Sequence, residues 1–136
     1  MQHWLTPYVL TIWAMGAMGG LLLVQLLVLD LAGLKARHRP GTPVEPDHGN
    51  FLFRATRAHA NTNESIAGFI LLGFFGVLSG APAGWLNTLS WIYVLARITH
   101  MLCYYAGVHL LRSLSFGVGL AALFGMLIAG VSAWSS

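Results

Sequence analysis

Two runs of polar side chains inside otherwise apolar stretches are the residues of this sequence that could do chemistry. The first run, with spacings of 3, 4 and 3, comprises Arg54, Arg57, Asn61 and Glu64. The second run, with spacings of 3 and 4, comprises Arg97, His100 and Tyr104. Residues three and four apart lie on one side of a helix, so each run predicts one polar helix face.

Together with Arg112, these faces could line one polar pocket that opens towards the cytosol. Arginines and several other hydrogen-bond donors suit an anionic ligand that carries carboxylates. Glu64 adds a carboxylate that suits an amino group, so the mixture fits a small zwitterionic peptide better than a lipid headgroup. For Arg54 and Arg57 taken alone, the simpler interpretation is that they reach towards lipid phosphates at the membrane surface.

Glu64 and Arg97 lie at matching depths in two successive apolar stretches. Each is roughly 20 Å from the basic end of its helix at a rise of about 1.5 Å per residue, so we expect the two side chains to meet. An ion pair of this kind could hold the helices in register, bind a ligand, or do both.

The composition indicates what must position these residues. Hydrophobic residues make up 57% of the 136 residues and charged residues only 8%, whereas a soluble domain has about 25% charged residues. The high hydrophobicity also excludes disorder. The single cysteine, Cys103, excludes a disulfide framework and a cysteine-based zinc site. Because no Lys and Arg cluster on a soluble face, nucleic acid is not an expected partner. We therefore expect an integral membrane protein.

We predict an all-α membrane fold, in which one domain, residues 1–136, forms a bundle of four transmembrane helices. The expected spans are roughly 8–32, 51–79, 85–110 and 113–134. A bilayer needs about 20 apolar residues for each helix that crosses it. A signal peptide is a poor interpretation of the first span, because the apolar run is too long and no Lys or Arg precedes it.

Small residues recur at four-residue spacing within the expected spans. They are Gly16 with Gly20, Gly76 with Gly80, and Ala121 with Gly125 and Ala129. Such spacing lets helix backbones approach closely in lipid, although glycine is also simply frequent in membrane helices. We expect close contacts between helices at these positions.

Three motifs within the spans resemble the MAPEG family, the membrane-associated proteins of eicosanoid and glutathione metabolism. The second span carries R-x-x-x-N-x-x-E, the third carries A-R-x-x-H-x-x-x-Y, and the fourth opens on Arg-Ser. The matching polar residues are, in chain order, Arg57, Asn61, Glu64, Arg97, His100, Tyr104, Arg112 and Ser113. The chain length and the four-span layout are similar as well.

The resemblance implies a homotrimer of four-helix subunits that binds glutathione, as a cosubstrate, between neighbouring subunits near the cytosolic face. The residues that would hold glutathione by motif position are Arg57, Asn61, Glu64, His100 and Tyr104, with Arg54 and Ser113 as further contacts. The catalytic residue would be Arg112, beside the glutathione sulfur.

Two positions depart from the family pattern. Ala60 stands where the family's prostaglandin synthase has an arginine ligand. The first-helix arginine of the eukaryotic members has no clear counterpart, and Lys35 or Arg37 could take its place. The resemblance therefore implies binding more directly than it implies a particular reaction.

By this resemblance the protein would be a membrane-bound glutathione transferase-like enzyme that uses glutathione on an apolar electrophile. Its expected partners are further copies of itself, glutathione, the electrophile and membrane lipid. The alternatives are a non-catalytic protein that binds glutathione or lipid, and a small transporter subunit. Six histidines are present, but they lack further ligands at metal-binding spacing, so neither a metal nor haem is expected.

The loops predict the orientation in the membrane, which we expect to be a bacterial inner membrane. Basic residues fall in the loop from Lys35 to Arg39 and at the turn with Arg112, whereas the segment from Gly80 to Gly84 has none. The positive-inside rule places the basic loops, and with them the active site, in the cytoplasm. Both termini are then expected outside.

This orientation can be tested with single cysteines in a Cys103→Ser background. A cysteine at His38 should be protected from a membrane-impermeant thiol reagent added to intact cells, because its loop is expected to be cytoplasmic. A cysteine at Ser135 is the matched control and should react. Labelling at position 38 from outside would contradict the predicted orientation.

Overall fold

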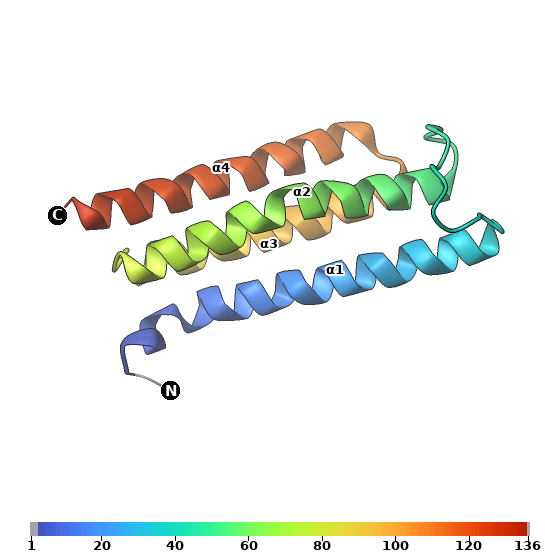
Figure 1. The fold of residues 1–136 in the computed structure, drawn as a ribbon. Helices are drawn as coiled ribbons and strands as arrows, with labels where there is room; N and C mark the ends of the chain where they lie inside the picture. The colour runs from blue at the N-terminus through green and yellow to red at the C-terminus, as the bar shows by residue number, and fades with distance from the viewer. Residues whose placement is uncertain (1–2, 136) are drawn as a thin grey trace.

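The computed structural model describes residues 3–135, and helices are the only regular secondary structure in that range. A short 3-10 helix, η1 (His3–Tyr8), leads into α1 (Val9–Lys35), which is followed by α2 (Phe51–Leu78), α3 (Ala83–Ala106) and α4 (His109–Trp134). The predicted all-helical fold is confirmed (Figure 1). Residues 1, 2 and 136, which belong to the expected single domain, lie outside the described range.

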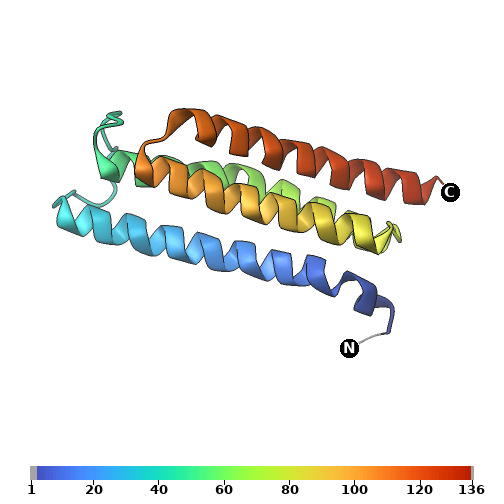
Figure 2. The ribbon, with the colours of Figure 1, turned by 180° about the vertical axis from the view of Figure 1, so that it is seen from behind.

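The four long helices run side by side, and each is antiparallel to the next one in the chain (Figures 1 and 2). α1 and α4 lie on opposite sides of the molecule, and both α2 and α3 contact every other helix of the four. The loop of residues 36–50 and the α3–α4 turn lie at one end, which we call the loop end. η1 and the end of α4 lie at the other end, the termini end.

Local sequence sets where the helices begin and end. The Asn50 side-chain oxygen accepts a hydrogen bond from the Leu52 N–H at 2.9 Å and so caps α2. α3 ends at Gly107, whose φ of 74° suits a residue without a Cβ. α4 begins at His109 rather than at the expected position 113, so Arg112 lies in the first turn of a helix instead of before it.

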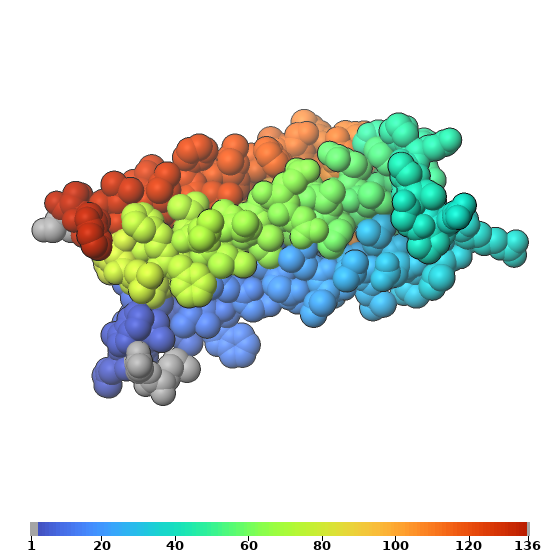
Figure 3. Space-filling view, in the orientation of Figure 1, coloured from blue at the N-terminus to red at the C-terminus, as the bar shows by residue number. Residues whose placement is uncertain are grey.

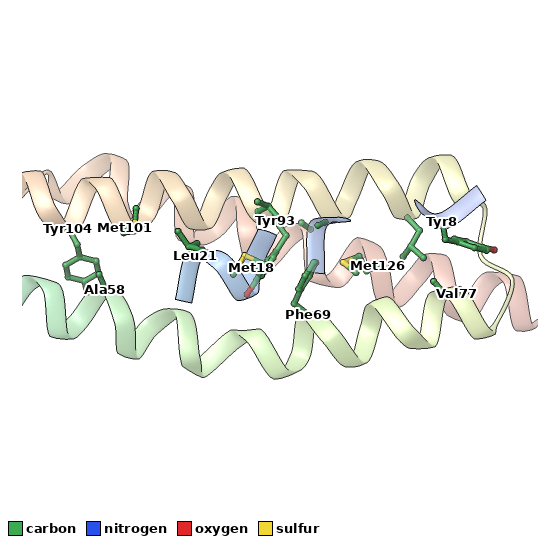
Figure 4. Close-up of a cluster of buried hydrophobic side chains, with 14 residues drawn as sticks. Tyr8, Met18, Leu21, Ala58, Phe69, Val77, Tyr93, Met101, Tyr104 and Met126 are labelled. Atoms are coloured by element: carbon green, nitrogen blue, oxygen red, sulfur yellow. The ribbon is translucent and has the colours of Figure 1, made fainter. Parts of the chain in front are cut away.

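One apolar core extends along the bundle (Figure 4). Phe69 of α2 stacks on Tyr93 of α3, with ring centroids 4.4 Å apart and ring planes 11° apart. Met18 of α1 and Met126 of α4 pack into the same core and are fully buried. Because side chains from all four helices interlock at this level, dense packing determines how the helices sit relative to one another.

Three helical segments within residues 3–135 are long and apolar enough to cross a membrane, namely the continuous η1–α1 segment, α2 and α4. The expected third span, α3, is not among them. The polar residues of α2 lie between Arg54 and Ser65 and leave the rest of that helix apolar, whereas those of α3 are spread along the helix from Asn87 to His100. The buried polar residues of α3 include Ser90, Arg97 and His100. Since α3 packs against all the other helices, these groups face protein, which is where polar groups of membrane bundles are tolerated.

The expected close packing at glycine is found at some positions and not at others. A Cβ at Gly76 would lie 2.7 Å from a methyl group of the buried Leu86 on α3. At Gly16 and Gly20 a Cβ would meet nothing within 4 Å, so this pair makes no close contact within one chain. Gly80 has a φ of 71° and serves the α2–α3 turn. Spacing alone therefore did not distinguish a packing glycine from a turn glycine.

We expect Gly76→Ala to lower the stability of the protein in detergent by about 1–3 kcal/mol, because the added methyl group overpacks the contact with Leu86. Gly68→Ala on the same helix is the matched control, since a Cβ there meets nothing within 4 Å. Its higher helix propensity should make that change neutral or stabilising by up to about 1 kcal/mol. Thermal unfolding followed by circular dichroism measures both variants. Equal effects would contradict a close α2–α3 contact at Gly76.

Candidate functional site

The polar run on α3 lies between α2 and α4, with Arg97 at its centre. Only 2% of Arg97 is exposed. Its Nη1 donates a 2.7 Å hydrogen bond to Oδ1 of Asn61 on α2. Its guanidinium carbon lies 5.6 Å from the centre of the Tyr93 ring on α3 and 5.4 Å from that of Phe116 on α4. An amide and two aromatic rings from three helices therefore hold the cation.

A glycine on α4 makes room for this buried guanidinium. A Cβ at Gly119 would lie 2.9 Å from Nη2 and 3.3 Å from Nε of Arg97. Nε has no hydrogen-bond partner among the residues that the structure describes. Arg97 thus occupies a slot that exists because α4 has no side chain at this point.

Aromatic and cationic groups continue from Arg97 towards the loop end. The His100 ring meets the Tyr104 ring edge-on, with centroids 5.1 Å apart. Arg112, in the first turn of α4, has its guanidinium carbon 4.6 Å from the centre of the Tyr104 ring. Tyr104 is buried, so it gives Arg112 a fixed aromatic surface. Phe116 links the two parts of the site, because its ring lies near both Arg97 and His100. We call the polar and charged members of this set the polar cluster; they are Asn61, Arg97, His100, Tyr104 and Arg112.

The expected ion pair between Glu64 and Arg97 is wrong within one chain. Arg97 bonds to Asn61 instead, and Glu64 is exposed. Three residues advance a helix by about 300°, so Glu64 is turned roughly 60° further out of the bundle than Asn61. A matching depth along two helices does not say on which side of α2 a carboxylate lies.

Arg57 and Glu64 lie on the face of α2 that turns away from the other helices. Both are exposed, whereas the buried face carries small residues such as Ala55 and Ala58. Figure 3 shows that α2 presents an open face between α1 and α4. Within one chain, the polar run of α2 is therefore split between two sides of the helix. Asn61 bonds to α3, whereas the charged side chains of Arg57 and Glu64 face outward.

Arg54 ties three segments together at the loop end. Its Nη1 donates a 2.7 Å hydrogen bond to the carbonyl of His48 in the loop, and its Nη2 donates a 3.4 Å bond to the carbonyl of Tyr105 near the end of α3. Its guanidinium carbon also lies 5.7 Å from the centre of the Phe51 ring. The Arg54 N–H groups that we had expected to contact a ligand thus donate to backbone carbonyls.

The remaining predicted contacts are exposed. The Ser113 hydroxyl donates to the His109 carbonyl at 3.2 Å, next to Arg112 on α4. Lys35 ends α1, and Arg37 follows with a left-handed φ of 51°. A single chain leaves both of these first-helix cations on the outside of the bundle at the loop end.

Three residues of the site escaped the sequence analysis, namely Tyr93, Phe116 and Gly119. Tyr93 precedes Arg97 by four residues and so extends the polar face of α3. Phe116 and Gly119 follow Arg112 at spacings of 4 and 3 on α4, which is the pattern that identified the other two faces. The available signal was an aromatic residue and a glycine on the same helix face as a lone arginine. Without knowledge that Arg97 points at this face, neither residue had a reason to be singled out.

A hollow of about 490 Å³ lies elsewhere, between the end of α1, the loop and the start of α2. Its walls include Asp30, His38, Thr42 and Thr56, but no member of the polar cluster. Within residues 3–135, no three His, Cys, Asp or Glu side chains are grouped so as to hold a metal ion. We locate the candidate site by the side-chain contacts, because none of the predicted binding residues lines this hollow.

The fold and the site define an α-helical protein that has helices long and apolar enough to cross a membrane, with a buried cationic, aromatic-lined cluster that reaches the loop end. The sequence model of the MAPEG family matches residues 10–132, which is most of the chain. The protein belongs to the MAPEG family, as its three motifs predicted. A search of curated proteins finds no match to the chain.

We expect Arg54→Met to keep the apolar stem of the side chain and to remove both carbonyl hydrogen bonds. The free energy of unfolding should fall by about 1–2 kcal/mol, because two carbonyls lose a charged donor at a partly exposed site. Amides of the loop should also exchange faster in hydrogen–deuterium exchange read by mass spectrometry. Lys35→Met, which removes an exposed cation at the same end, is the control. Unchanged loop exchange in Arg54→Met would show that Arg54 does not hold the loop.

Proposed function

We propose that this protein is a membrane glutathione transferase-like enzyme, which activates the thiol of glutathione and transfers the tripeptide to an apolar electrophile. Membership of the MAPEG family supports chemistry of this kind. The observation that carries the proposal is the Arg112 guanidinium lying over the Tyr104 ring. A cation held in place beside a binding site is what a thiolate needs.

A thiol is a poor nucleophile until it loses its proton. Its reference pKa is about 8.5, so only a few per cent is thiolate near neutral pH. A guanidinium keeps its own proton and stabilises the anion. The N–H groups at the start of α4 add positive potential close to Arg112. The thiol proton passes to water, and the thiolate sulfur forms a bond to the electrophilic carbon. At the same time the leaving group departs from that carbon with its electron pair or, for an activated double bond, the π pair moves to the neighbouring atom, which then takes a proton from water.

The rest of the tripeptide would be held by the polar cluster and by the charged face of α2. Asn61, His100 and Tyr104 offer uncharged polar groups that can hydrogen-bond to a peptide. Arg57 suits a ligand carboxylate, and Glu64 suits the ligand ammonium group. Ser113 lies next to Arg112 and could bond to the same end of the ligand.

Arg57 and Glu64 would serve this site through a neighbouring copy of the chain. Both are exposed on a helix that is apolar enough to cross a membrane. A carboxylate that faced lipid about 20 Å from the start of its helix would be costly. A homotrimer whose copies cover this face of α2 would remove that cost. Glutathione would then bind between copies, near the loop end on the cytoplasmic side.

The electrophile would reach Arg112 from the bilayer. Leu111, Leu114 and Phe116 surround the start of α4 and are exposed, so apolar surface borders the cation directly. Apolar molecules concentrate in lipid, whereas glutathione stays in water. Bringing these two reactants together in a fixed geometry would be a large part of the catalytic effect.

Arg112→Ala should leave the affinity for glutathione within roughly tenfold of the parent but lower the conjugation rate by about a hundredfold or more, as loss of one charge-stabilising donor can. Ultraviolet thiolate absorbance, titrated with glutathione on purified protein, should be present in the parent and absent in the variant. The pH–rate profile should move to higher pH, because the bound thiol returns towards its ordinary pKa of about 8.5.

Arg39→Ala is the matched control, since it removes an exposed arginine at the same end of the bundle and should leave both signals unchanged. Parental conjugation and thiolate formation in Arg112→Ala would mean that Arg112 only anchors α4 on Tyr104. A parent that binds glutathione but conjugates no generic electrophile would favour the alternative function, a non-catalytic binding protein.

A further inference from the structure

The hydrogen bond between Arg97 and Asn61 determines which end of the Asn61 amide is free. A guanidinium has only donors, so the Asn61 atom that faces Nη1 of Arg97 at 2.7 Å is the carbonyl oxygen Oδ1. The opposite assignment would set N–H groups against one another. The free end of this half-buried amide is therefore Nδ2, which has two N–H donors and no acceptor.

We propose that Arg97 is the positioning residue that makes Asn61 a donor-only contact for glutathione. Asn61 then selects a carboxylate or carbonyl oxygen of the ligand and rejects an ammonium or amide N–H group. The inference deepens the proposed function and rests on it. Arg97 acts through Asn61 and does not itself touch glutathione.

Arg97 is held firmly enough to keep the Asn61 amide from turning over. Its guanidinium carbon lies 5.6 Å from the centre of the Tyr93 ring and 5.4 Å from that of the Phe116 ring. Behind it, the backbone of Gly119 is so close that even a Cβ would lie 2.9 Å from Nη2. A guanidinium keeps its proton, so it cannot change from donor to acceptor. The amide is thus oriented before a ligand arrives, and binding loses little rotational freedom there.

The charge of Arg97 favours a carboxylate over a neutral carbonyl. Within residues 3–135 its hydrogen bond goes to a neutral amide, and its Nε has no hydrogen-bond partner. In a poorly solvated bundle an uncompensated cation attracts anions more strongly than it would in water. The Nδ2 donors of Asn61 and the positive charge of Arg97 therefore both favour a carboxylate of the ligand.

Nuclear magnetic resonance of the full chain, with isotope-labelled asparagine side chains in detergent, tests the orientation of the amide. The Asn61 signal is identified by its absence in Asn61→Asp. Glutathione should shift the Nδ2–H signals of Asn61, because they become donors to a carboxylate. The signals of Asn87, whose amide is already bonded to Thr11 and Pro7, should move little.

Arg97→Gln tests the positioning role, because glutamine can accept as well as donate and leaves the Asn61 amide free to turn. The KM for glutathione should rise roughly tenfold or more, as loss of a charge-assisted bond can cause. The kcat at saturating glutathione should stay within about threefold of the parent. Ser65→Ala is the matched control. It removes the 2.7 Å bond between Ser65 and Tyr93, which also joins α2 to α3, and leaves Tyr93 itself beside Arg97, so KM should not change.

Asn61→Asp keeps the inference testable if Arg97→Gln does not fold. The new carboxylate can still pair with Arg97, so thermal stability should be retained. The two donors are lost, so glutathione affinity should fall roughly tenfold or more. The inference is overturned by an unchanged KM in Arg97→Gln, by an equal rise of KM in Ser65→Ala, or by parental glutathione affinity in Asn61→Asp. In each of these cases conjugation by the parent still upholds the proposed function. A parent that neither binds nor conjugates glutathione overturns both.

Discussion

A buried arginine that bonds to an amide rather than to a carboxylate is the constraint on which the rest of this structure depends. Removing such a charge from water costs several kcal/mol even after relaxation, and Arg97 is only 2% exposed. The bundle offsets that cost with Oδ1 of Asn61, two aromatic rings and a glycine slot. Because these groups come from α2, α3 and α4, the contacts that accommodate the cation also fix the three helices that carry the polar cluster.

The same constraint gives α2 two different faces. Asn61 turns towards Arg97 and becomes part of the interior, whereas Arg57 and Glu64, on the same polar run, remain exposed. A membrane helix tolerates exposed charges poorly, so the outer face of α2 requires either water or protein. In the proposed homotrimer a neighbouring copy supplies that protein, and the charges that one chain leaves outside complete a site between two chains.

Sequence patterns predicted those features that depend on local chemistry. The apolar runs predicted helices at positions close to those observed, and three short motifs indicated the MAPEG family, to which the chain belongs. The patterns failed where a side chain had several possible partners. Glu64 was expected to meet Arg97, and Arg54 was expected to meet a ligand, yet Asn61 bonds to the first arginine and backbone carbonyls bond to the second.

The sequence by itself determined that this protein is helical and largely apolar, and that its polar groups lie at defined depths along the helices. Hydropathy and helical periodicity can be read along a single chain, without knowledge of how the helices pack. The sequence also determined which side chains are near the loop end, since depth follows from the rise per residue. Only the tertiary structure decided which partner each polar group takes. Helical spacing gives a direction to within about a quarter of a turn, but a hydrogen bond needs its two atoms within about 3 Å of each other. That distance depends on how α2, α3 and α4 pack, and in particular on the absence of a side chain at Gly119, which lets Arg97 lie where Asn61 can reach it.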